Sequence, residues 1–257
     1  MSSSSTGRVA LVTGGGRGIG RAISLGLAHD GFDVAIGYRR DADAAAEVVA
    51  AIAGTGRAAS AYPADLADTA AVEELVASAA ADFGRLDVVV ANGGIASRGH
   101  SVADTDPAEL ERVLRVHALG AHALCRAAVP HLREHDRSDV ILISSVATLT
   151  HAANGGPYNM AKAALEALGL TLAKEELRHG TRVNIVAPGL VDTQMGQRLM
   201  QAVAGIDDLR SLDPAMPFGH VCTPDDVANV VRWLVSDANT YVTGQKVNVD
   251  GLASFSR

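Results

Sequence analysis

Cysteine is scarce in this 257-residue sequence, which has only Cys125 and Cys222, in no metal-ligand or redox spacing. Their positions predict neither a disulfide framework nor a metal site, and they fit a reducing compartment. Long apolar runs are lacking as well. Although 48% of the residues are hydrophobic, no run approaches the roughly 20 residues that a membrane-spanning helix needs. We therefore expect a water-soluble, cytoplasmic protein without a membrane partner.

The chain also lacks an excess of positive charge, since its formal net charge is -7 at pH 7. Nucleic acid is therefore not an expected partner, although a local basic patch could still hold a small anion. Residues 1–7 are polar and show neither the basic region nor the apolar core of a secretory signal. We expect a short disordered lead-in followed by a single domain over residues 8–257, a size that α/β folds often reach.

What the chain does have is an alternation of short β-branched runs with longer alanine-rich amphipathic stretches. This alternation predicts an α/β fold in which a doubly wound parallel sheet carries helices on both faces. Helix starts are expected at Asp106-Pro107 and Thr223-Pro224, where a capping side chain precedes a proline. About residues 190–220, periodicity is lost, and we expect a substrate lid. Seven strands are predicted near Val9–Val12, Val34–Tyr38, Ala58–Tyr62, Val88–Ala91, Val140–Ile143, Val183–Val186 and Lys246–Val249.

A glycine-rich segment directly follows the first predicted strand and reads Thr13-Gly14-Gly15-Gly16-Arg17-Gly18-Ile19-Gly20. The helix that begins there aims free backbone N–H groups and a positive dipole end at the turn, which suits a pyrophosphate. A glycine cluster alone would equally indicate an ordinary strand-to-helix turn, but both flanking elements are predicted here. The segment therefore indicates a Rossmann-type dinucleotide site, with contacts from Gly14, Gly16, Arg17, Gly18, Ile19 and Gly20.

Three further residues suggest acid–base chemistry. Tyr158 and Lys162 are four residues apart at the start of a predicted helix, so they share one face. A nearby ammonium lowers the pKa of a tyrosine from about 10 and makes it a usable acid or base. Ser145 stands thirteen residues before Tyr158, at the strand end where open sheets bind ligands. Each residue alone is explained as well by a helix anchor, a solvated lysine or a turn serine, but together they predict proton transfer.

Together these segments resemble the short-chain dehydrogenase/reductase family along nearly the whole chain, from Arg8 to Leu252. The resemblance rests on the T-G-x-x-x-G-x-G form of the glycine segment and on the serine, tyrosine and lysine. It implies catalytic roles for Ser145, Tyr158 and Lys162. Ala91-Asn92-Gly93-Gly94 departs at two positions from the family's usual Asn-Asn-Ala-Gly. The further cofactor contacts that the resemblance implies are Asp65, Leu66, Asn92, Gly94, Pro188, Gly189 and Thr193.

The clearest departure from the family is His117, which stands where relatives usually have an asparagine of the proposed catalytic tetrad. In the family's relay, the main-chain carbonyl of that asparagine fixes a water between the lysine and bulk solvent, and its side chain holds a helix irregularity. His117 keeps the carbonyl. It is either a tolerated structural replacement or a member of the relay that adds a pH dependence, and we favour the first hypothesis.

The residues after the second strand bear on cofactor choice. They read Tyr38-Arg39-Arg40, without the acid that accepts from the ribose hydroxyls and selects NAD. The guanidinium groups of Arg39 and Arg17 suit a 2′-phosphate, so NADP(H) is the predicted cofactor and NAD(H) the alternative.

The implied reaction is hydride transfer between nicotinamide and a carbonyl or secondary alcohol carbon of a small-molecule substrate. Within the family, the sequence most resembles 3-oxoacyl-carrier-protein reductases and glucose-dehydrogenase-like enzymes. A ketone reductase or 3-oxoacyl reductase is therefore favoured. The alternatives are an NAD(P)-dependent alcohol or sugar dehydrogenase and a non-catalytic nucleotide-sensing protein on the same fold. The resemblance also implies a homotetramer or homodimer that packs through helices near residues 108–134 and 158–178.

Overall fold

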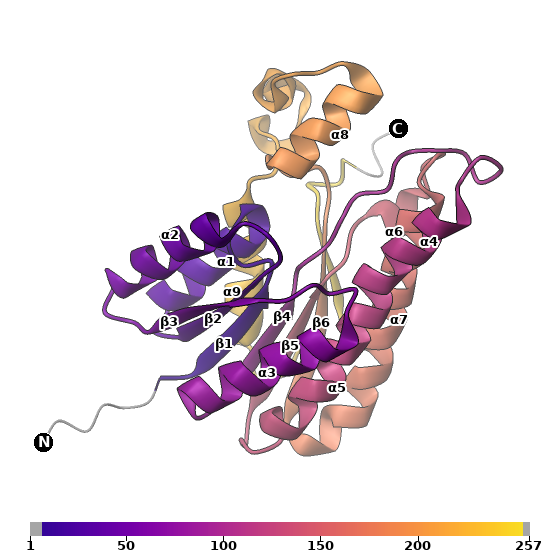
Figure 1. The fold of residues 1–257 in the computed structure, drawn as a ribbon. Coiled ribbons are helices and arrows are strands. Elements are labelled where there is room, and N and C mark those ends of the chain that lie inside the picture. Colours follow the sequence, from indigo (N-terminus) through magenta and orange to yellow (C-terminus); the bar gives the residue numbers. More distant parts are fainter. Residues whose placement is uncertain (1–6, 254–257) are drawn as a thin grey trace, which may run out of the picture.

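Seven parallel strands form one sheet in the order β3-β2-β1-β4-β5-β6-β7, as Figure 1 shows for the computed structural model, which describes residues 7–253. All seven predicted strands are present, so the predicted single-domain Rossmann-type architecture is confirmed. The predicted lead-in, residues 1–7, lies outside the described residues except for Gly7. The strands are β1 Val9–Thr13, β2 Asp33–Tyr38, β3 Ala59–Pro63, β4 Val88–Ala91, β5 Ser138–Ile143, β6 Thr181–Pro188 and β7 Lys246–Val249.

Helices cover both faces of the sheet (Figure 1). One face carries α1 Gly18–His29, α2 Ala42–Ala53 and α9 Pro224–Val235. The opposite face carries α3 Thr69–Phe83, α5 Gly120–Leu132 and α7 Gly156–Glu176. Along β1, Val9 and Leu11 belong to one buried apolar cluster and Ala10 and Val12 to the other, because successive strand side chains point to opposite faces. The sheet is therefore the shared wall between two halves of the core.

Both predicted helix starts are present. The Asp106 carboxylate accepts from the backbone N–H of Ala108 at 2.9 Å, and Pro107 opens α4 (Pro107–Leu114). Thr223 and Asp226 cap α9 reciprocally, since each side chain accepts from the backbone N–H of the other. Such caps satisfy N–H groups that have no partner within the helix.

The long helix expected near residues 108–134 is interrupted. A π-helical turn, η1 (Arg115–Leu119), separates α4 from α5 and contains His117. Within this turn the Gly120 N–H donates to the Arg115 carbonyl. The irregularity that the resemblance implied at His117 is therefore present, in the form of a π-bulge.

The segment predicted to be an irregular lid contains more regular structure than expected. Thr193 caps α8 (Gln194–Ala204) by accepting from the Gly196 N–H at 3.1 Å, and 3-10 turns follow at η3 (Leu209–Ala215) and η4 (Pro217–Gly219). This segment, orange in Figure 1, stands above the carboxyl edge of the sheet. The remaining short turns are α6 (Ala147–Thr150) and η2 (Leu177–His179). Over residues 7–253 no helix is both long and apolar enough to cross a membrane.

Candidate active site

The glycine-rich segment turns tightly from β1 into α1. Gly14 has a positive φ of 63°, a conformation that residues with a Cβ rarely adopt. A Cβ on Gly20 would lie 2.2 Å from the Gly14 carbonyl oxygen, so no larger residue fits there. Gly16, Gly18 and Ile19 complete the turn. The helix α1 begins at Gly18, with its N-terminus at the carboxyl edge of the sheet. The loop thus has the close backbone approach that a pyrophosphate cradle requires.

Asn92 ties the loop after β4 to this cradle. Its side-chain amide donates to the Thr13 carbonyl oxygen at 2.9 Å. The Thr13 hydroxyl in turn accepts from the N–H groups of Asn92 and Gly93, each at 3.0 Å. Asn92 therefore joins the two loops that border the predicted cofactor site.

The other predicted cofactor residues lie at the same carboxyl edge. Asp65 and Leu66 follow β3, Gly94 follows β4, and Pro188 ends β6 just before Gly189. Thr193 lies against the glycine segment, because its Cγ2 would be 3.3 Å from a Cβ on Gly18. The Thr193 hydroxyl is already used as the cap of α8. The start of α8 is thereby fixed beside the cradle.

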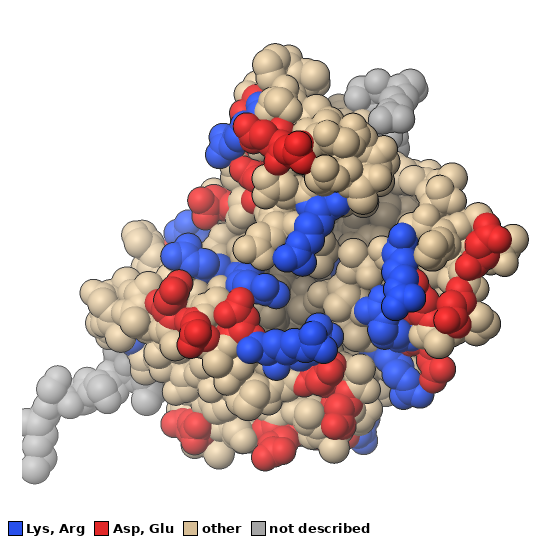
Figure 2. Space-filling view, turned by 45° about the horizontal axis from the view of Figure 1, so that its top comes forward, with Lys and Arg blue, Asp and Glu red and all other residues tan. Residues whose placement is uncertain are grey.

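Arg17 and Arg39 are exposed beside the cradle. Arg17 lies 3.4 Å from the Asp41 carboxylate, and both side chains are substantially solvated. Figure 2 shows Lys and Arg side chains gathered around the hollow at this edge, although the chain as a whole is acidic. The local field therefore suits an anion, in contrast to the net charge.

Ser145, Tyr158 and Lys162 are brought together. Ser145 follows β5, and the two other residues lie in the first turns of α7. Ser145 lies close enough to Tyr158 to lower the pKa of the phenol. The buried Lys162 ammonium donates to the Ile143 carbonyl oxygen at 2.7 Å and lies 5.6 Å from the centre of the Tyr158 ring. The three predicted residues thus form one group at the carboxyl edge of the sheet, the same edge as the glycine-rich segment.

The electrostatics of this group differ from the sequence-based expectation. Burial raises the pKa of Tyr158, although some of its surface is exposed, and the nearby Ser145 side chain opposes that rise. Burial lowers the pKa of Lys162 to about 7, and the Glu166 charge opposes that change. The expected lowering of the Tyr158 pKa by Lys162 is therefore wrong for this structure. The reason is that burial of the phenol itself disfavours the charged phenolate more than its neighbours favour it.

His117 lies buried beside the same group. Its ring packs edge-on against that of Tyr158, with centroids 5.4 Å apart. Its Nε2 is 2.8 Å from the Ile95 carbonyl oxygen and 3.1 Å from the Ile95 N–H nitrogen. Burial, reinforced by the Lys162 charge, lowers the pKa of His117 to about 3. The histidine is therefore neutral across the physiological range.

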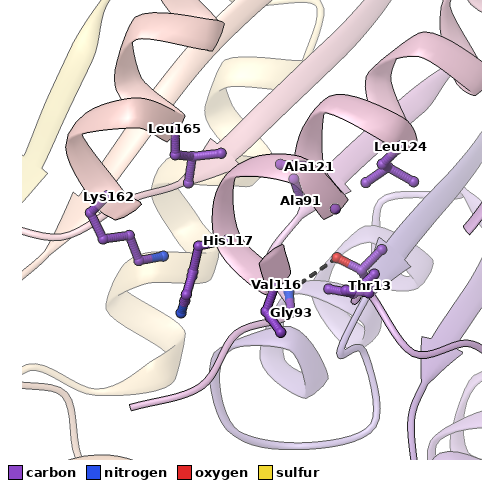
Figure 3. A pocket seen from close by; sticks show the side chains of 11 residues that line it. Thr13, Ala91, Gly93, Val116, His117, Ala121, Leu124, Lys162 and Leu165 are labelled. Carbon is purple, nitrogen blue, oxygen red and sulfur yellow. Dashed lines mark hydrogen bonds between the residues drawn. The ribbon is translucent and has the colours of Figure 1, made fainter. Parts of the chain in front are cut away.

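A small cavity adjoins these residues (Figure 3). Lys162 and His117 lie at one end of it and Thr13 at the other. Its volume of about 10 Å³ is at the lower limit for a single water.

Glu166 was not singled out by the sequence analysis. It continues the stripe of Tyr158 and Lys162 at the same four-residue spacing, and its carboxylate accepts from the Ser144 hydroxyl at 2.6 Å. The four-residue spacing was the signal in the sequence that could have identified Glu166. The partners of its carboxylate come from other elements and could not be read from the sequence.

A parallel sheet with a glycine cradle, and with serine, tyrosine and lysine at the same edge, defines a class of nucleotide-dependent oxidoreductases. A family model described as Enoyl-(Acyl carrier protein) reductase matches residues 14–251. Versicolorin reductase stcU of Emericella nidulans is 37% identical over 95% of this chain and 95% of that protein. L-rhamnose 1-dehydrogenase (NAD(P)(+)) of Sphingomonas sp. is 33% identical over the same shares, 95% and 95%.

Solved structures agree with these sequence comparisons. A short chain dehydrogenase from Burkholderia cenocepacia J2315 in complex with NADP is 37% identical. It has a TM-score of 0.86 and covers 95% of this chain and 96% of that one. The chain belongs to the short-chain dehydrogenase/reductase family.

Proposed function

We propose that this protein is an NADP(H)-dependent carbonyl reductase that acts on a ketone or a 3-oxoacyl compound. The observation that carries the proposal is the joint placement of Ser145, Tyr158 and Lys162 beside the glycine cradle. The residues present fit a dinucleotide, because a Cβ on Gly20 would fill the tight turn that the cradle needs. The nicotinamide, when bound, supplies or accepts the hydride.

The chain's own residues would manage the proton. The raised pKa of Tyr158 keeps its phenol protonated at neutral pH, which suits donation to a carbonyl oxygen. The Ser145 hydroxyl would donate a hydrogen bond to the same substrate oxygen. Lys162, with a pKa of about 7, can take up and release a proton near neutrality. The small cavity next to Lys162 and His117 is just large enough for one water that could exchange this proton.

Preference for NADP(H) rests on Arg17 and Arg39. The Arg17–Asp41 pair is exposed at 3.4 Å, and such pairs contribute about 0–1 kcal/mol. A charge-assisted contact to a 2′-phosphate is worth roughly 1.5–3 kcal/mol. The Arg17 guanidinium would therefore bind the 2′-phosphate in preference to the Asp41 carboxylate. The NADP complex of the Burkholderia cenocepacia relative supports this choice.

The segment of residues 190–220 is proposed to cover the substrate. It begins against the glycine segment, and α8 exposes the side chains of Met195 and Leu199. Apolar side chains on this cover would favour a substrate with a hydrophobic body. We propose accordingly that the small-molecule substrate is held between this segment and the Ser145–Tyr158 group.

A second candidate is an NAD(P)-dependent alcohol or sugar dehydrogenase, because one relative is named L-rhamnose 1-dehydrogenase (NAD(P)(+)). The same residues catalyse both directions, so an assay must decide. A panel of ketones, β-ketoesters, quinones, secondary alcohols and sugars, each with both cofactors, is followed by absorbance of the reduced nicotinamide. Reduction with NADPH supports the first candidate, and exclusive oxidation of sugars supports the second.

The decisive variant is Tyr158→Phe, which removes the proton donor and leaves the ring in place. We expect turnover to fall at least about a hundredfold, the lower bound of a general acid contribution. NADPH binding, followed by its fluorescence, should be retained. Tyr62→Phe is the matched control. Tyr62, on β3, is also partly buried, and its hydroxyl donates to the Asp82 carboxylate at 2.8 Å. A Tyr158→Phe variant with near-normal turnover would refute the proposal.

A further inference from the structure

A charged network lies behind the turn that carries Ser145. At its centre is Glu166 in α7, whose side chain is 16% exposed. Its Oε1 accepts from the Ser144 hydroxyl at 2.6 Å and from the Thr148 hydroxyl at 2.8 Å. Lys246 in β7 completes the network, with Nζ 2.8 Å from Oε1 and 3.0 Å from Oε2 of Glu166. The turn after β5, the helix α7 and the distant strand β7 therefore meet at one carboxylate.

The residues bound to Glu166 lie on both sides of Ser145. Ser144 precedes it, and Thr148 follows it in α6. The Thr148 hydroxyl is also 3.0 Å from the Ser145 carbonyl oxygen and accepts from Lys246 Nζ at 2.6 Å. Within the turn, the Ala147 N–H donates to the Ser145 hydroxyl oxygen at 3.1 Å. The carboxylate thus holds the turn at both ends and limits where the Ser145 hydroxyl can lie.

The same face of α7 holds the end of β5 at two successive residues. Lys162 Nζ donates to the Ile143 carbonyl oxygen at 2.7 Å, and one helical turn later Glu166 accepts from Ser144. Tyr158 precedes Lys162 on this face by one turn. The helix that carries the phenol is therefore connected directly to the turn that carries the hydroxyl.

Burial of the Glu166 carboxylate would be unfavourable without compensating partners. A largely buried carboxylate needs donors and a compensating cation, because each desolvated charge is unfavourable. Ser144, Thr148 and Lys246 supply them. A second ion pair, between Glu176 at the far end of α7 and Arg133 just after α5, is equally well formed at 2.6 Å. Position relative to Ser145 is what distinguishes the two.

We propose that Glu166, held by Lys246, is a positioning residue that fixes the Ser145 hydroxyl opposite the Tyr158 phenol. The proposal rests on the proposed function, since it assumes that Ser145 touches the reacting oxygen. Neither Glu166 nor Lys246 needs to touch the substrate.

The test measures kcat and KM for NADPH-dependent reduction of ethyl acetoacetate, or of the best ketone from the panel. Glu166→Gln keeps an acceptor for the hydroxyls and removes the charge that holds Lys246. We expect kcat to fall about tenfold with KM for NADPH little changed, because small displacements of a reacting group cost up to about a hundredfold. Lys246→Met should lower kcat by a similar factor. Lys246→Arg, which keeps the positive charge, should retain most of the wild-type kcat. Glu176→Gln is the matched control and should keep the wild-type kcat.

The distinguishing experiment places Glu166→Gln in a Ser145→Ala background. If the carboxylate acts through the Ser145 hydroxyl, its removal should cost less than about twofold there. An equal loss in both backgrounds would show a general structural role and overturn the inference, as would a Glu166→Gln enzyme with unchanged kcat. NADPH affinity and melting temperature of every variant establish that the comparison is between folded proteins. Wild-type activity of Ser145→Ala alone would instead overturn the assigned role of Ser145, and Tyr158→Phe tests the proposed function separately.

Discussion

Replacing His117 by asparagine is the sharpest test of how burial controls this site. The His117 side chain is 4% exposed, and its pKa is lowered from 6.5 to about 3. The native state therefore binds fewer protons at this group than the unfolded state does between those two values. The stabilisation that follows is fully present above pH 6.5 and is lost as pH falls toward about 3. Asparagine does not titrate, so the variant should lack this component.

The magnitude follows from linkage. Between about pH 7 and about pH 4.5, a histidine with these two pKa values loses roughly 2–3 kcal/mol of unfolding free energy. Urea unfolding of both proteins at the two pH values measures it, and contributions from all other groups cancel in the difference. His122→Asn, an exposed position in α5, controls for exchanging histidine for asparagine. A difference below about 0.5 kcal/mol would show that the burial argument is wrong.

The same variant tests the catalytic hypothesis. His117 Nε2 lies near both the N–H and the carbonyl of Ile95, but one nitrogen can serve only one of them at a time. An asparagine amide has both a donor and an acceptor, so the contact should survive. We expect turnover within about tenfold of wild type and an unchanged profile between about pH 5.5 and 9. A loss beyond about a hundredfold, or disappearance of an ionisation near neutrality, would place His117 in the proton relay.

Three further predictions concern the serine, the cofactor and assembly. Ser145→Ala should lower turnover but leave measurable activity, because one hydrogen bond to the reacting oxygen is lost while the proton donor stays; an unchanged rate would exclude Ser145 from the site. Arg39→Asp should weaken NADPH binding by one to two decades, about 1.5–3 kcal/mol, with little effect on NADH, and titration calorimetry with both cofactors measures this. A wild-type preference for NADH would contradict that assignment. Light scattering should show a homotetramer or homodimer, since α7 and its neighbours expose Leu119, Leu170 and Leu177; a monomer at micromolar concentration would contradict it.

Local sequence was sufficient for the strands, the two capped helix starts and the glycine turn. Each depends on residues close together in the chain: β-branched runs for buried strands, Thr223 with Asp226 for a cap, a glycine at position 20 for close approach. Tyr158 and Lys162 were likewise found because their spacing equals one helical turn. The irregularity at His117 came from the resemblance. The helix α8 was missed although Met195, Leu199 and Val203 recur at helical spacing within the segment that was expected to be irregular.

Tertiary structure alone decided the electrostatics and the support of the site. The pKa of Lys162 falls because the folded chain buries its ammonium, a quantity that the spacing from Tyr158 does not contain. His117 meets Ile95 across 22 residues, and Lys246 meets Thr148 across 98. Such contacts depend on the order of the strands and on how the helices and loops pack around them, which local patterns do not specify. The sequence by itself identified the groups that we propose for the chemistry, and the fold sets their pKa values, because desolvation and neighbouring charge arise only when distant segments pack together.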